Sequence, residues 1–155
     1  MLGFLATNAM AVLGMGVFLS FGNNHQFTPI MFALLSLLIS WQLHILMHSF
    51  WDRIMTGFDK PISITMDITA LNRAARCGLA SVVALAAVLG RISVKELIKI
   101  IPIFVFGYTC SEVIIEKKIL ASDPGGTFIV FTFASIFALV FSFILGKKQI
   151  PQSSI

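Results

Sequence analysis

The sequence predicts an all-α integral membrane protein with about five transmembrane helices. Of its 155 residues, 57% are hydrophobic and 12% are charged, whereas a soluble domain carries about 25% charged residues. The mean hydropathy is +0.95. Several apolar stretches approach the length of about 20 residues that a helix needs to cross the hydrocarbon core. Because isolated strands cannot satisfy their backbone hydrogen bonds in lipid, each stretch is predicted to be a helix.

The predicted helices follow one another with polar segments between them, of which 52–69 is the longest. They are expected at about 2–21, 28–51, 70–89, 97–115 and 126–145. The runs that close them are "GNNHQ", "DR", "GR", "EKK" and "GKK". Residues 1–146 therefore form one predicted transmembrane domain, and 147–155 form a polar C-terminal tail.

The basic balance of the chain is explained by membrane topology. The net charge is +4, but the basic residues punctuate apolar segments, as in membrane proteins, so no nucleic-acid partner is predicted. Cys77 and Cys110 lie in or beside apolar segments and are interpreted as small buried side chains. The sequence has no CxxC pair, zinc-ligand spacing, GxGxxG or hydrolase signature. It therefore predicts neither an enzyme nor a cofactor.

Two histidines in the second predicted helix are candidates for chemistry inside the membrane. His44, His48 and Asp52 are spaced four residues apart, which places all three on one helix face. Ionisable groups within a membrane are usually functional, so this face could relay protons or hold a metal. Alternatively, His48 and Asp52 simply reach the interface at the helix end. A metal would need more ligands than these helices offer, so no metal site is predicted. If a metal were bound, His44 and His48 would be the candidate ligands.

Two acidic residues lie at positions where a carboxylate requires a hydrogen-bond or charge partner. Glu112 stands within the apolar stretch "YTCSEVII", where it must be hydrogen-bonded, paired or protonated. It could attract a cation at a pore mouth or brace neighbouring backbone, and both interpretations stay open. Asp123 precedes Pro124-Gly125-Gly126. It is predicted to accept hydrogen bonds from the first turn of the helix that follows, while the glycines allow backbones to approach closely.

The order and spacing of several stretches resemble the first half of the Rhesus glycoproteins, the animal branch of the ammonium transporter family. The stretches are "GMGVFLSFGNNHQFTPIMFALLSLLISWQLHILMHSFW", "VALAAVLGRIS" and "SEVIIEKKILASDPGGTFIVFTFASIFAL". The resemblance covers nearly all of the chain apart from residues 52–76 and the last few. It implies half of an inverted-repeat bundle that assembles as a trimer, each protomer with its own narrow pore.

The resemblance also implies roles for individual residues. Glu112 falls on the acid of the outer vestibule that recruits ammonium, and Asp123 on the acid that braces the pore helix. Trp51 falls on a phenylalanine gate, with Phe50 beside it. The first pore histidine should stand eight residues after Asp123, where this chain has Phe131. A phenylalanine cannot accept or relay a proton, and its ring would obstruct a pore.

These features predict a Rhesus-type ammonium or ammonia transport protein, or a partial or degenerate member of that family. The alternative is a non-conducting membrane subunit that assembles with a complete homologue, which Phe131 favours. Expected partners are the lipid bilayer, related subunits in a homo- or hetero-trimer, and ammonium or ammonia as substrate. The expected location is a membrane, namely the plasma membrane, which the chain crosses several times.

Overall fold

The computed structural model describes residues 28–57, 66–87, 92–120 and 126–146, together with Ala6 and Ala9. These residues form four α-helices and one π-helical turn and contain no strand. The elements are α3 (Thr28–Thr56), α4 (Ile68–Ala86), α5 (Val94–Ile114), η2 (Ile115–Ile119) and α6 (Thr127–Leu145). Ala6 and Ala9 are helical, and the rest of the predicted first helix, 2–21, lies outside the described residues.

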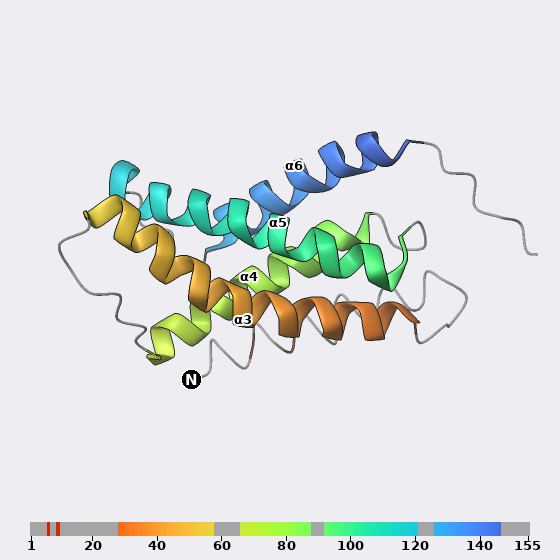
Figure 1. Ribbon diagram of the computed structural model, residues 1–155, viewed down its shortest axis with the longest axis horizontal. Coiled ribbons are helices and arrows are strands. Elements are labelled where there is room, and N and C mark those ends of the chain that lie inside the picture. The colour runs from red at the N-terminus through yellow and green to blue at the C-terminus, as the bar shows by residue number, and fades with distance from the viewer. Residues whose placement is uncertain are drawn as a thin grey trace, which may run out of the picture.

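The four helices pack as a bundle with α4 at its centre. In Figure 1, α3 and α5 lie side by side and run in the same direction, while α4 crosses behind them and α6 runs back in the opposite direction. α3 packs against both α4 and α5, and α6 packs chiefly against α4. Small side chains on α4 allow this close packing, as is common between membrane helices. They are Ala74, Ala75, Gly78, Ala80, Ser81 and Ala84, and all of them are buried.

Three of these helices are long and apolar enough to cross a membrane. The spans are Ile30–Thr56, Val94–Ile119 and Thr127–Leu145. α4 is not among them, because its first turns carry Arg73 and Arg76 and its remainder is rich in alanine. A helix surrounded by other helices does not need large apolar side chains to face lipid. The all-α membrane fold is therefore confirmed.

Helix ends differ from the predicted ones where polar side chains find partners. α3 continues past Trp51 to Thr56, because the charges that follow it are paired with a neighbouring helix rather than left in lipid. α5 begins at Val94, three residues before the predicted start. Ser93 Oγ accepts a hydrogen bond from the Glu96 backbone N–H at 3.4 Å, and Glu96 Oε2 accepts one from the Ser93 N–H at 2.8 Å. This reciprocal capping box satisfies two backbone donors and fixes the start of the helix.

One glycine sets how closely α3 and α4 approach each other. A Cβ atom built on Gly78 would lie 2.9 Å from Nε1 of Trp41 and 3.2 Å from Cγ of Leu37. Both distances are shorter than an ordinary van der Waals contact. The absence of a side chain at Gly78 therefore lets α3 pack closely against α4. This packing also brings the polar residues of α3 close to α4.

Candidate functional site

A polar stripe runs along α3 from the centre of the bundle to its end. Its members recur every four residues, so each lies next to the one before it and the stripe winds slowly around the helix. They are Ser36, Ser40, His44, His48, Asp52 and Thr56. The first three are buried, the next two are half-buried and Thr56 is exposed. The predicted common face of His44, His48 and Asp52 is thus part of a longer feature that connects the buried core to the helix end.

The deepest ionisable members of the site are a buried pair between α3 and α5. His44 Nε2 lies 2.7 Å from Oε2 of Glu112. The two residues are 1% and 2% exposed. A hydrogen bond of this length between an imidazole and a carboxyl group is typical of charge-assisted bonds. Either group alone would be costly to bury, because an unpaired charge loses its hydration. Each side chain therefore offsets the cost of burying the other.

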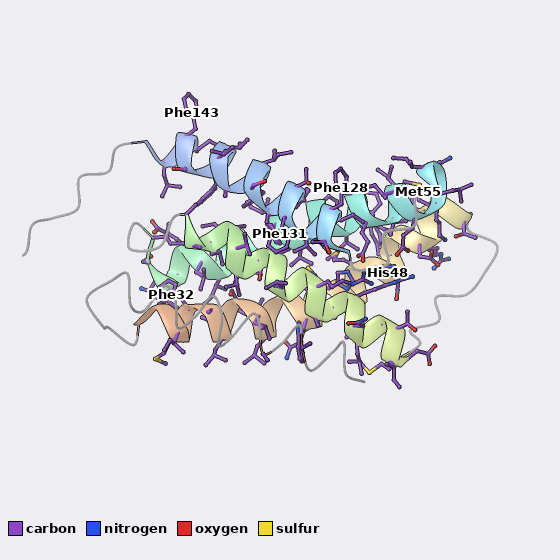
Figure 2. The ribbon with its side chains drawn as sticks, turned by 180° about the vertical axis from the view of Figure 1, so that it is seen from behind. Phe32, His48, Met55, Phe128, Phe131 and Phe143 are labelled. Carbon is purple, nitrogen blue, oxygen red and sulfur yellow. The ribbon has the colours of Figure 1, made fainter. Side chains whose placement is uncertain are left out.

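A second set of contacts lies one helical turn further along and includes α4. Arg73 Nη1 donates to Nε2 of His48 at 2.9 Å, and Arg73 Nη2 lies 3.2 Å from Oε2 of Glu116. Figure 2 shows His48 beside α4, the helix that carries its partner Arg73. Because a guanidinium only donates, Nε2 of His48 is the acceptor. The positive charge of Arg73 is matched by Glu116.

A third set closes the site at the bundle end. Lys117 forms an ion pair with Asp52 and donates a hydrogen bond to Oγ1 of Thr56 at 2.7 Å. Glu116 and Lys117 both belong to the π-helical turn η2, and such turns often occur at functional sites. We call the three sets together the polar ladder: His44–Glu112, then His48–Arg73–Glu116, then Asp52–Lys117–Thr56.

Sequence reasoning missed four members of the polar ladder: Arg73, Glu116, Lys117 and Thr56. One signal was available, because Glu116 follows Glu112 by four residues and shares its helix face. In the sequence, Arg73 lies near the start of the predicted helix 70–89, and Lys117 lies in the run "EKK" that closes the predicted helix 97–115. Their partners on α3 are distant in sequence, so only the packing of the helices identifies them.

The two histidines are engaged by protein groups. Nε2 of His44 meets Glu112, and Nε2 of His48 accepts from Arg73. Within the described ranges, no group of three or more His, Cys, Asp or Glu side chains is arranged to hold a metal ion. A guanidinium beside His48 also disfavours a second cation there. Cys77, which is buried, and Cys110 are both free thiols.

The aromatic residues assigned to a gate lie near the outer part of the polar ladder. The ring of Trp51 is 5.0 Å from that of Phe106 on α5 and 5.8 Å from that of Phe50, measured between centroids. Trp51 is half-buried, whereas Phe50 is 48% exposed. Trp51 follows His44 by two turns on α3. The structure therefore places an aromatic contact between α3 and α5 in the same part of the bundle as Asp52 and Lys117.

Phe131 lies elsewhere, on the buried side of α6. It is half-buried and packs against the hydrophobic core. In Figure 2 it lies near the middle of the bundle, between α6 and α4, whereas Phe143 projects away from it. Among the described residues, no ring contact joins Phe131 to Trp51. The residue assigned to the pore-histidine position is thus part of the apolar packing.

The start of α6 is a close contact with α4. Gly126 holds the N-cap position in the left-handed conformation, with φ of 65°. A Cβ atom on Gly126 would lie 2.5 Å from both Cδ and Nη1 of Arg76. The predicted close approach of backbones is not what this contact shows, because the neighbour of Gly126 is the side chain of Arg76. Asp123 lies outside the described residues and is not at the N-cap, so its role at the helix start stays a prediction.

Comparison with known proteins identifies the family. The profile of the Ammonium Transporter Family matches residues 1–153. The chain belongs to the ammonium transporter family. This is a family of transporters rather than of enzymes, and it accounts for a chain that crosses the membrane several times.

Curated relatives of Rhesus type match nearly all of the chain. It is 29% identical over 150 residues to "Ammonium transporter Rh type C" of Rattus norvegicus, covering 97% of this chain and 29% of that protein. It is 27% identical to "Ammonium transporter Rh type B" of Xenopus tropicalis and 26% identical to that of Danio rerio, covering 32% of each. The chain therefore spans about a third of the length of these relatives. No solved structure matches the chain.

Proposed function

We propose that this chain acts in the transmembrane transport of ammonium or ammonia, as a Rhesus-type subunit that requires a second helical bundle to form a pore. The observation that carries the proposal is Glu112. It is an acid that the family pattern assigns to ammonium recruitment, and it is retained here as an ionisable group inside an apolar helix. Burying a carboxylate is costly unless it has a role or a partner.

The aromatic contact of Trp51 with Phe106 supports the same proposal. A gate needs bulky rings that block a passage and move by rotation. Trp51 and Phe50 supply such rings on α3, one to two turns from the His44–Glu112 pair. A cation approaching Glu112 from the bundle end would pass them.

A second candidate function is favoured by Phe131. An apolar ring at the position of the first pore histidine removes the group that would accept a proton or hydrogen-bond ammonia. Phe131 packs against the hydrophobic core, so the position contributes to stability. On this hypothesis the chain is a non-conducting subunit that assembles with a complete homologue, in a trimer at the plasma membrane.

Co-expression with a complete Rhesus-type relative separates the two functions. Cells that lack ammonium transporters receive the relative alone or together with this chain, and methylammonium uptake and co-purification are measured. Glu112→Gln in this chain should lower the uptake if the chain contributes a conducting vestibule, while Glu116→Gln, one turn away, serves as the matched control. Co-purification with uptake that neither variant alters would support the non-conducting subunit. Failure to co-purify, with no change in uptake, would contradict both.

A further inference from the structure

The His44–Glu112 pair differs from the rest of the polar ladder in how its charge is balanced. Arg73 balances Glu116, and Lys117 balances Asp52, so the two outer sets contain permanent cations. Glu112 instead faces an imidazole at 2.7 Å. Among the described residues no Lys or Arg lies within ion-pair distance of Glu112. Arg76 on α4 also acts on the charge of Glu112, from beyond ion-pair distance. The group that contacts the carboxylate directly, and that can carry a positive charge there, is the imidazole of His44.

The charged groups around the His44–Glu112 pair already have partners of their own. The groups of the ladder nearest to the pair are His48 and Asp52 on α3, Arg73 on α4 and Glu116 on η2. All of them are engaged with one another or with Lys117. His44 itself retains one unused polar atom, because its buried Nδ1 has no hydrogen-bond partner among the described residues. The pair is therefore a closed unit in which a carboxylate accepts from a single N–H donor.

An imidazolium N–H and an ammonium N–H offer a carboxylate the same chemistry: one positive charge and a donor at hydrogen-bond distance. We propose that, in the isolated chain, His44 is a tethered internal cation that occupies the carboxylate of Glu112, so that ammonium binds this carboxylate only where the imidazole is displaced. Removing the imidazole turns Glu112 into a binding site for small protonated amines. The choice of ammonium as the ligand rests on the function proposed above, whereas the occupancy of Glu112 by His44 rests on the geometry of the pair.

Chemical rescue of the full chain in detergent tests this proposal. The midpoint of thermal unfolding is compared in ammonium chloride, imidazolium chloride and potassium chloride at equal ionic strength. Potassium is the control because it is a cation of similar size that has no N–H donor. The wild-type midpoint should be the same in all three salts. In potassium, the midpoint of His44→Ala should be lower than that of wild type. In ammonium or imidazolium, the midpoint of this variant should be about 3 °C or more higher than in potassium, as expected when a ligand binds only the folded state.

Two further variants separate this proposal from a simple loss of packing. His44→Gln fills much of the space and keeps a neutral donor, so it should be less stable than wild type and should gain nothing from ammonium. His44→Ala combined with Glu112→Gln removes the acceptor, so its midpoint should not depend on the salt. Rescue of this double variant, or a wild-type shift as large as that of His44→Ala, would contradict the proposal.

A measurement on the wild-type chain covers the case in which His44→Ala does not fold. Nitrogen NMR of histidine-labelled chain gives signals from three histidines. His44 should be protonated on both ring nitrogens, whereas a neutral ring would overturn its role as a cation. The readouts also keep the two proposals apart. Rescue without uptake in the co-expression experiment rejects the transport function alone, and uptake without rescue rejects the tethered cation alone.

Discussion

Replacing Gly126 by alanine should strongly destabilise the start of α6, for two separable reasons. Gly126 has φ of 65°, and an alanine in the left-handed region costs roughly 1–2 kcal/mol. The new Cβ would also lie 2.5 Å from Cδ and Nη1 of Arg76, a distance at which something must move. These atoms belong to the far end of a flexible side chain, which moves more easily than backbone, so the added cost should lie near the low end of overpacking, about 1 kcal/mol. The expected loss in the free energy of unfolding is therefore about 2–3 kcal/mol.

Gly57 provides a matched control for the backbone term. Its φ is 95°, also left-handed, but a Cβ there would meet nothing within 4 Å. Gly57→Ala should therefore cost only the backbone term, about 1–2 kcal/mol. Truncating Arg76 to alanine should remove the overlap, so that Gly126→Ala in that background costs about as much as Gly57→Ala. Unfolding of all four variants in mixed detergent micelles measures these differences. Equal costs for Gly126→Ala and Gly57→Ala in the wild-type background would refute the close contact.

Two further predictions concern the packing of α3 against its neighbours. Gly78→Ala should lower the free energy of unfolding by about 1–3 kcal/mol, because its Cβ would press on Trp41; unchanged stability and unchanged tryptophan fluorescence would contradict the contact. Glu112→Gln should cost about 3–5 kcal/mol, because it breaks a buried pair, whereas Glu116→Gln, half-exposed beside Arg73, should cost less than about 1 kcal/mol. The same unfolding assay compares them, and similar losses would show that burial does not distinguish the two acids.

Hydrophobicity alone located the helices, and three of the observed helices are long and apolar enough to cross a membrane. The stretches 28–51, 70–89, 97–115 and 126–145 each correspond to one observed helix. Periodicity also placed His44, His48 and Asp52 on one face of α3 correctly. These are local properties, since each depends only on residues within a few turns of one helix.

The ends of the helices and the partners of the charges needed the packed structure. Asp52 was expected to mark the end of a helix, but its ion pair with Lys117 on η2 lets α3 continue to Thr56. The partner of His44 is 68 residues away in sequence, and no pattern in either helix specifies which faces meet. The capping box of Ser93 and Glu96 was readable in the sequence, because Ser and Glu stand three residues apart before an apolar run.

The roles of Phe131 and Glu112 came from resemblance rather than from physical reasoning. Chemistry alone left Glu112 as either a cation site or a structural brace. Its contact with His44 now supplies a structural partner. Phe131 would have been taken for one of many core rings, as its packing on α6 indeed suggests. Its significance comes entirely from its position eight residues after Asp123 in the family pattern.

Ammonia flux through the chain by itself tests the central proposal most directly, namely that this family member does not form a pore without a second bundle. The purified chain is reconstituted into vesicles that enclose a pH-sensitive dye, and the internal pH is followed after an ammonium pulse. The proposal predicts a rate of alkalinisation equal to that of protein-free vesicles. Flux clearly above that rate, and abolished by Glu112→Gln but not by Glu116→Gln, would contradict it.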